Sequence, residues 1–210
     1  MSEKPFDYKK EYPKLYSPKV KPELIEVPEM NFVMVDGIGE PNQNPTFEAA
    51  IELLYGFSYT IKMSKMKGNQ PAGYFEYVVP PLEGLWWIET GEFDFEKRDN
   101  WRWTLMIRQP EFVDEVFFNW ASEELLRKKP ELNHKKARFE AFFEGKCVQM
   151  MHLGSYATEP ETIKQIQEFI FILDLKEKVG SDGKHHEIYL SDPRKIDPKK
   201  MKTVLRHPVV

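Results

Sequence analysis

The feature that most constrains this chain is an order of elements that occurs twice. The first copy has a strand, a glycine turn, a helix and then further strands, at residues 31–37, Gly39, 45–65, 74–79, 83–89 and 101–109. The second copy has the same order, at residues 146–153, Gly154, 158–173, 186–190 and 202–207. The match is one of pattern rather than identity. A duplicated β-α-β-β unit predicts an α+β fold: one curved antiparallel sheet with helices on one face and a ligand cleft on the other.

The starts of the predicted helices carry recognisable capping residues. Asn44 can cap a helix that has Pro45 at its first position. Thr158 and Glu161 have the spacing of a capping box. Another helix is predicted to open at Pro110, and the charged connector over residues 128–146 is predicted to hold at most a short helical stretch.

The repeats predict a single domain over residues 31–210, with half-repeats at about 31–108 and 146–207. Residues 1–30 are rich in proline, which argues against a long regular helix there. The tyrosines and leucines between the prolines predict an extended N-terminal arm that packs on the body.

Composition excludes several classes of function. The chain has 210 residues and a net charge of −4, so nucleic acid is not an expected partner. Cys147 is the only cysteine, which fits a reducing cytoplasm. We recognise no signal peptide, no apolar run long enough for a membrane helix, and no HExxH, CxxC, GxGxxG or P-loop motif. We therefore expect no membrane association, no metal and no cofactor. The sequence leaves open whether the protein forms a homodimer.

Alternation along residues 185–190 singles out Glu187 and Tyr189. Ile188 and Leu190 lie on one face of the predicted strand, and Glu187 and Tyr189 lie on the other. We expect the Ile188 face to lie under the helices, so that Glu187 and Tyr189 point to the open face. There, a carboxylate beside a phenol can act as a general base or hold a cation. The alternative is a solvated glutamate on a half-exposed strand.

Aromatic residues make up 14% of the chain and predict either a large core or an aromatic cleft. Trp86 and Trp87 are adjacent, so one can face the core and the other the cleft. Trp103 shares a face with apolar residues of its strand, which favours the core, although indoles also stack on flat ligands. Tyr55 lies one helical turn from Tyr59, and it either points to the cleft or packs on the sheet.

Several stretches resemble the GyrI-like small-molecule-binding-domain family, in its stand-alone form. They are VPEMNFVMVDGIGEP, LLYGFSYTIKM, YVVPPLEGLWW, WRWTLMIRQP, CVQMMHLGSY, HHEIYLSDPRK and KTVLRHPV, and they span nearly the whole chain after residue 20. The resemblance is nearest to members that act as cyclopropanoid cyclopropyl hydrolases. It implies two β-α-β-β units with a ligand cleft between them, and a glutamate at the position of Glu187 in an aromatic pocket.

This resemblance implies hydrolysis of the cyclopropane in duocarmycin- or yatakemycin-like DNA alkylators, which protects the cell. Glu187 would then activate water, and Tyr189, Tyr55 or an indole N–H would donate to the carbonyl oxygen. The candidate ligand-binding residues for a planar aromatic molecule are Trp86, Trp87, Trp103, Tyr156 and His185. Two alternatives stay open: a non-catalytic binder that sequesters or senses planar aromatic or cationic molecules, and a protein-interaction module.

Overall fold

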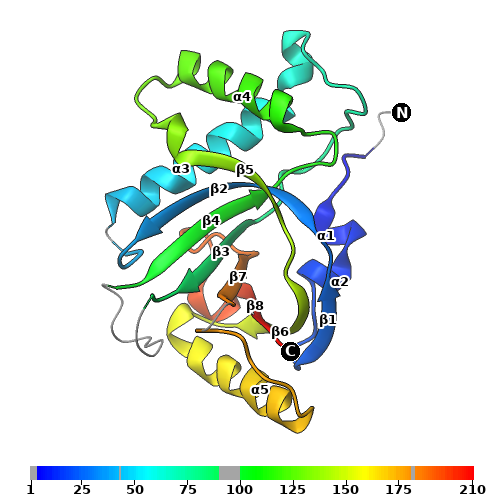
Figure 1. Ribbon diagram of the computed structural model, residues 1–210, viewed down its shortest axis with the longest axis vertical. Helices are drawn as coiled ribbons and strands as arrows, with labels where there is room; N and C mark the ends of the chain where they lie inside the picture. The colour runs from blue at the N-terminus through cyan, green and yellow to red at the C-terminus, as the bar shows by residue number, and fades with distance from the viewer. Residues whose placement is uncertain (1–3, 43, 90–99, 181–182) are drawn as a thin grey trace.

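The computed structural model describes residues 4–42, 44–89, 100–180 and 183–210, and most of these pack around one curved antiparallel sheet (Figure 1). Within the described residues the sheet has eight strands, in the order β1-β6-β8-β7-β3-β4-β2-β5. Their bounds are β1 Glu23–Val27, β2 Met30–Ile38, β3 Leu82–Trp87, β4 Arg102–Arg108, β5 Ala137–Phe142, β6 Gly145–Leu153, β7 His185–Tyr189 and β8 Lys202–Pro208.

The strand order contains the predicted duplication. One unit consists of β2, helix α3 (Pro45–Lys62), β3 and β4, and the other of β6, helix α5 (Glu159–Ile172), β7 and β8. The first unit contributes the neighbouring strands β2-β4-β3, and the second contributes β6-β8-β7, with β3 beside β7 in the middle. The predicted α+β fold with one curved antiparallel sheet is therefore confirmed, and β1 and β5 extend it at its two edges.

The first turn of α3 forms as its sequence predicts. The Asn44 side chain accepts hydrogen bonds from the backbone N–H groups of Thr46 and Phe47, at 3.0 and 3.4 Å. The capping box predicted at Thr158 does not form, because the Thr158 hydroxyl instead donates to the carbonyl oxygen of Ser155, at 2.8 Å. In both units a glycine with positive φ, at 94° for Gly39 and 138° for Gly154, turns the chain out of the first strand.

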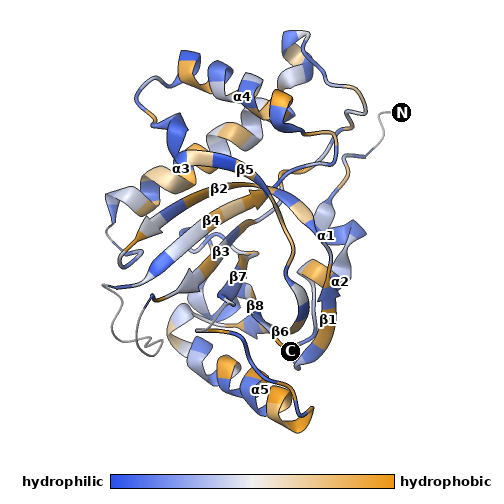
Figure 2. Ribbon diagram, in the orientation of Figure 1, coloured by the Kyte–Doolittle hydropathy of each residue, from blue (hydrophilic) through white to orange (hydrophobic). Residues whose placement is uncertain are grey.

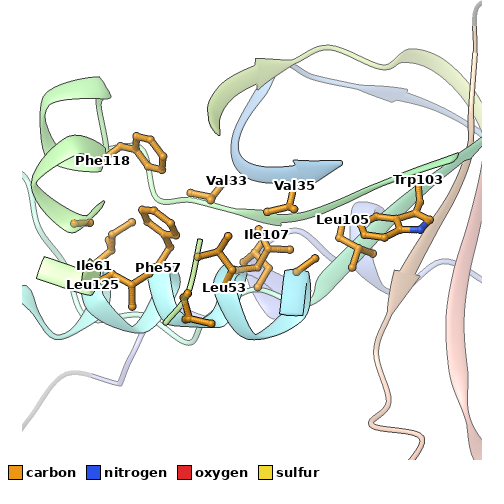
Figure 3. Packing of buried hydrophobic residues seen from close by; sticks show 14 of the residues in the cluster. Val33, Val35, Leu53, Phe57, Ile61, Trp103, Leu105, Ile107, Phe118 and Leu125 are labelled. Carbon is orange, nitrogen blue, oxygen red and sulfur yellow. The ribbon is translucent and has the colours of Figure 1, made fainter. Parts of the chain in front are cut away.

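A row of directly opposed residues across the sheet shows which face the helices cover. Directly opposed residues on neighbouring strands project to the same face. The row runs through Met150, Leu205, Glu187, Gly84, Leu105 and Val35. Val35 and Leu105 pack under α3 and helix α4 (Glu115–Lys128), whereas Met150 and Leu205 pack under α5. Figure 3 shows the α3–α4 part of this core. Glu187 therefore lies on the helix-covered face, midway between the two packed clusters.

The opposite face is covered by the N-terminal segment, which contains the short helices α1 (Tyr8–Glu11) and α2 (Pro13–Tyr16). Tyr8, Leu15 and Tyr16 pack there in one buried cluster with Ile188. The prediction that Ile188 lies under the helices, leaving Glu187 and Tyr189 on an open face, is therefore wrong. Both faces of the strand are covered, so the alternation of apolar residues did not indicate which face the helices occupy.

Both edge strands lie in segments that were expected to lack strands. Strand β1 falls within the N-terminal 30 residues and pairs with β6, and β5 falls within the charged connector and pairs with β2. In contrast, the predicted strand at 74–79 makes only an isolated bridge, between Tyr77 and Phe6. The β5 sequence, ARFEAF, does alternate apolar and polar residues over 137–141, but the charged residues around it in the connector obscured this signal.

The carboxyl end of α5 has an exposed apolar surface. Figure 2 shows hydrophobic residues gathered there, and Phe171 and Ile172 are 84% and 75% exposed. Even so, in the described part of the chain no helix combines the length and apolar character needed to cross a membrane.

Candidate functional site

The centre of the candidate site is Glu187, in the middle of β7. Glu187 is only 7% exposed, and its Oε1 atom lies 3.1 Å from Nε2 of His185. Gly84 is directly opposite on β3. A Cβ atom at Gly84 would lie 2.9 Å from both Trp86 Nε1 and Tyr189 Oη. The glycine thus leaves the space in which these side chains meet.

Tyr189 connects Glu187 to the indole of Trp86. The Trp86 N–H donates to the Tyr189 hydroxyl oxygen, at 3.2 Å, and Glu187 lies near the same hydroxyl, on the same face of β7. Burial, together with the adjacent Glu187 charge, raises the pKa of Tyr189 well above its usual value. The phenol therefore stays protonated at neutral pH and can act as a hydrogen-bond donor.

Tyr156 and Glu159 approach the same place from the start of α5. The Tyr156 ring lies edge-on to that of Tyr189, with the centroids 6.1 Å apart. Burial raises the pKa of Tyr156, and the charges of Glu187 and Glu159 raise it further. Glu159 is 4% exposed and also raises the pKa of Tyr189. The site thus combines two buried carboxylates with two protonated phenols. Such a set can accept a proton, donate hydrogen bonds or bind a cation.

Other aromatic rings hold Trp86 in place. Its ring stacks on Phe47, with centroids 5.9 Å apart, and it meets Trp101 edge-on at 5.5 Å. Trp86 is 2% exposed, so its orientation is fixed by packing as well as by its bond to Tyr189. We call Glu187, Tyr189, Trp86, Tyr156 and His185 the Glu187 site.

Three of the predicted site residues lie outside this group, although Trp103 is directly opposite Trp86 on the same face of the sheet. Trp87 is on the opposite face, where the Lys184 ammonium lies 3.8 Å from its ring centroid. Trp103 is fully buried in the α3 core, beside Leu105 in Figure 3. Tyr55 stacks on Tyr59, with centroids 6.3 Å apart, and its hydroxyl makes no hydrogen bond to Glu187 within the described residues. We therefore do not assign these three to the Glu187 site.

Four residues near the site were not among the predictions. They are Gly84, Glu159, Glu177 and His207. Alternation along residues 202–207 could have placed His207 on the same face as Leu205. Glu159 and Glu177 come from outside the sheet, on the first turn of α5 and after its end, so strand periodicity carries no signal for them.

The described ranges contain no group of three or more His, Cys, Asp or Glu side chains arranged to hold a metal ion.

Solved structures resemble this chain over nearly its whole length. One, described as an uncharacterized conserved protein from Listeria innocua, is 50% identical with a TM-score of 0.94, covering 98% of this chain and 100% of that chain. A second, described as a hydrolase from Listeria innocua, is 47% identical with a TM-score of 0.89 and the same coverage. A third, described as a hydrolase encoded by lin2189 from Listeria innocua, is 49% identical with a TM-score of 0.91, covering 99% of this chain and 100% of that chain.

More distant comparisons extend the likeness in fold. The EcmrR C-terminal domain is 15% identical with a TM-score of 0.53, covering 90% of this chain and 97% of that chain, and this likeness shows the fold alone.

The family model described as the GyrI-like small molecule binding domain matches residues 21–209. No curated protein matches the chain.

Proposed function

Because the chain belongs to the GyrI-like small molecule binding domain family, we propose that it binds a planar aromatic molecule at the Glu187 site and hydrolyses it. The substrate class that we propose is the cyclopropane-bearing alkylators of the duocarmycin and yatakemycin type. Opening the ring removes the electrophile that attacks DNA, so the reaction protects the cell from within its cytoplasm. Two of its relatives, at 47% and 49% identity, are described as hydrolases, which supports the reaction class.

The observation that carries this proposal is the buried carboxylate of Glu187 beside protonated phenols and an indole. A solvated surface glutamate would be surrounded by water rather than by phenols and an indole. Here the carboxylate lies 3.1 Å from His185 and near the Tyr189 hydroxyl, and the residue directly opposite Glu187 on β3 is Gly84. The side chains of Trp86 and Tyr189 occupy the room beside Gly84, and Trp86 supplies an aromatic wall against which a planar substrate would lie.

The chemistry requires one base and one donor. The cyclopropane is conjugated to a carbonyl, so water can attack a ring carbon. A carbon–oxygen bond forms, a ring carbon–carbon bond breaks, and its electron pair moves to the carbonyl oxygen. Glu187 takes the proton that water loses, and the Tyr156 hydroxyl donates to the oxygen that gains charge. We assign this donation to Tyr156, whose hydroxyl stays protonated near Glu187 because burial and the adjacent carboxylates raise its pKa.

Product analysis tests this proposal. The protein would be incubated with a molar excess of a cyclopropane-bearing alkylator in ¹⁸O-labelled water. We expect many equivalents of ring-opened product for each protein chain, with the label in the new hydroxyl group. Product that never exceeds one equivalent per chain, or unlabelled product, would contradict hydrolysis.

A non-catalytic binder is the second candidate, and the observation that favours it is Glu159. Two buried carboxylates near the same phenols attract a cation more strongly than one would. Under this alternative, the protein sequesters planar aromatic cations with a stoichiometry of one. A cationic dye and its neutral analogue of equal shape would distinguish the two cases. Preference for the cation that is lost in Glu159→Gln, together with no turnover of the alkylator, would favour the binder.

A further inference from the structure

A continuous chain of hydrogen-bonded groups leads from Glu187 to the protein surface. Nδ1 of His185 lies 2.6 Å from Nε2 of His207, and Nδ1 of His207 hydrogen-bonds to Oε1 of Glu177. At the other end, Nε2 of His185 lies 3.1 Å from Glu187. Each imidazole therefore uses one ring nitrogen toward the site and the other toward the surface.

The groups along this hydrogen-bonded chain differ in their access to water. The histidines are 1% and 2% exposed, whereas the side chain of Glu177 is 24% exposed. Backbone hydrogen bonds hold Glu177 in place: Lys178 N–H donates to Pro208 and Lys176 N–H to Val210, both at 2.9 Å. The segment that carries Glu177 thus extends the ladder beside the end of β8.

We propose that His185, His207 and Glu177 form a proton relay that exchanges the proton of Glu187 with solvent at the protein surface. The relay would let the carboxylate change its protonation state while a ligand covers the site. Its use in catalysis rests on the proposed function, whereas the relay itself is a property of the ligand-free protein.

The proton count of the relay balances. Three protons bridge the four groups, one in each hydrogen bond. When they point toward the site, Glu187 is ionised and Glu177 holds a proton. When each moves across its own bond, Glu187 holds a proton, Glu177 is ionised, and both imidazoles are neutral again. One proton equivalent has then crossed the chain, and the net charge of −1 is unchanged.

The surrounding charges suit a relay through neutral imidazoles. Burial lowers the pKa of His207, and the neighbouring His185 lowers it further, while Glu177 and, from the opposite face, Glu144 raise it. At the inner end, Tyr189 and Tyr156 face Glu187 as protonated phenols. The net effect lowers the pKa of His207, so its imidazole is neutral at pH 7 and can pass a proton without carrying a charge.

His152 is a histidine that offers a matched reference. It lies on the same face and is 2% exposed, but its ring bonds to the Thr162 hydroxyl at 2.8 Å and to the Ser155 carbonyl oxygen at 3.0 Å. A carbonyl oxygen only accepts, so Nε2 of His152 carries its proton. In an NMR titration, this ring reports what a buried, structurally fixed histidine does.

Histidine ring nitrogen NMR on the ligand-free chain tests the relay. The perturbation is Glu187→Gln, and the signal read is that of His207, which Glu187 does not touch. We expect the titration midpoint of His207 to move by about one pH unit, as coupled sites do, while the His152 signals stay unchanged. An unchanged His207 titration would overturn the relay, because a purely structural tether transmits no proton.

An activity measurement separates this inference from the proposed function. With the cyclopropane-bearing alkylator, we expect Glu177→Gln to lower turnover at least about tenfold at unchanged substrate affinity, since an amide cannot pass a proton. The surface control Glu168→Gln, on the exposed side of α5, keeps the full rate. Coupling of His207 without turnover in any variant would sustain the relay and refute hydrolysis. Full turnover in Glu177→Gln, together with an unchanged His207 titration in Glu187→Gln, would refute the relay and sustain hydrolysis.

Discussion

A buried ion cluster on the face opposite the Glu187 site predicts how stability depends on pH. It consists of Glu83, Glu144, His186 and Arg206, and we call it the back-face cluster. The two ring nitrogens of His186 lie 3.0 Å from carboxylate oxygens of Glu144 and Glu83, and Arg206 Nη1 lies 3.1 Å from Glu144. With His186 protonated, the cluster holds two negative and two positive charges. Loss of the His186 proton leaves one uncompensated buried negative charge.

The signs of the pKa shifts define the pH window. Burial alone would lower the pKa of His186, but Glu144 and Glu83 raise it from 6.5 to about 9. This contribution to stability is complete below pH 6.5 and is lost as the pH rises through 9. Burial alone would raise the pKa of Glu144, but His186 and Arg206 lower it from 4.5 to about 2. That contribution is complete above pH 4.5 and is lost as the pH falls through 2. We therefore expect the cluster to stabilise the fold most between about pH 4.5 and 6.5.

The size of the effect follows from the His186 shift. One pKa unit corresponds to about 1.4 kcal/mol, so raising the pH from 6.5 to above 9 should remove roughly 3 kcal/mol from the free energy of unfolding. The Glu144 shift describes the same interaction from the other side, so the two contributions are not added. Glu144→Gln leaves Arg206 without its buried anionic partner and should cost about 3–5 kcal/mol at pH 6.

Urea unfolding at a series of pH values measures this prediction. The difference in unfolding free energy between wild type and Glu144→Gln should shrink between pH 6.5 and 9, with the m-value unchanged. Glu52→Gln is the control, because Glu52 pairs with Lys129 on the surface and is 53% exposed, so less than about 1 kcal/mol should be lost. A difference for Glu144→Gln that stays constant from pH 6 to 9 would refute the assignment of this charge to His186.

Three further predictions concern the Glu187 site and α3. Gly84→Ala places a Cβ 2.9 Å from Trp86 Nε1 and Tyr189 Oη. The resulting strain of about 1–3 kcal/mol exceeds the gain of about 0.5–1 kcal/mol that comes from replacing a glycine in a strand. Calorimetry should therefore show weaker ligand binding and a lower stability of the fold. Trp86→Phe removes the donor to Tyr189 and should weaken ligand affinity by about tenfold, whereas Trp87→Phe on the opposite face should leave affinity unchanged; equal losses in a fluorescence titration would contradict this. Asn44→Ala should lower the unfolding free energy by about 1 kcal/mol without affecting ligand binding, as measured by urea unfolding.

Much of the fold could be predicted from local patterns in the sequence. The two glycine turns, the Asn44 cap and the periodicity of two or 3.6 residues identify the duplicated elements. Which face of the sheet each side chain occupies could not be predicted. Leu105, Met106 and Ile107 are all 0% exposed, so this strand is apolar on both sides, and only the tertiary packing distinguishes the sides.

The site was predictable to the extent that it lies on one strand. Alternation alone places Glu187 and Tyr189 on a common face. Glu159 and Glu177 reach the site region from α5 and from the segment after it, and such contacts depend on how helix and sheet pack. Trp103 was predicted as a candidate ligand-binding residue but is buried in the core. Its indole lies where a side chain at Gly37 would be, 2.0 Å from an added Cβ, so the close contact with Gly37 encloses the ring.

The turnover of Glu187→Gln tests whether Glu187 is the base of a hydrolase. Glutamine keeps the shape of the side chain and removes its ability to accept a proton. With the cyclopropane-bearing alkylator in excess, we expect the variant to retain substrate binding and to lose about 10²-fold or more in turnover. A variant that opens the ring as fast as the wild type would show that Glu187 only lines the binding site.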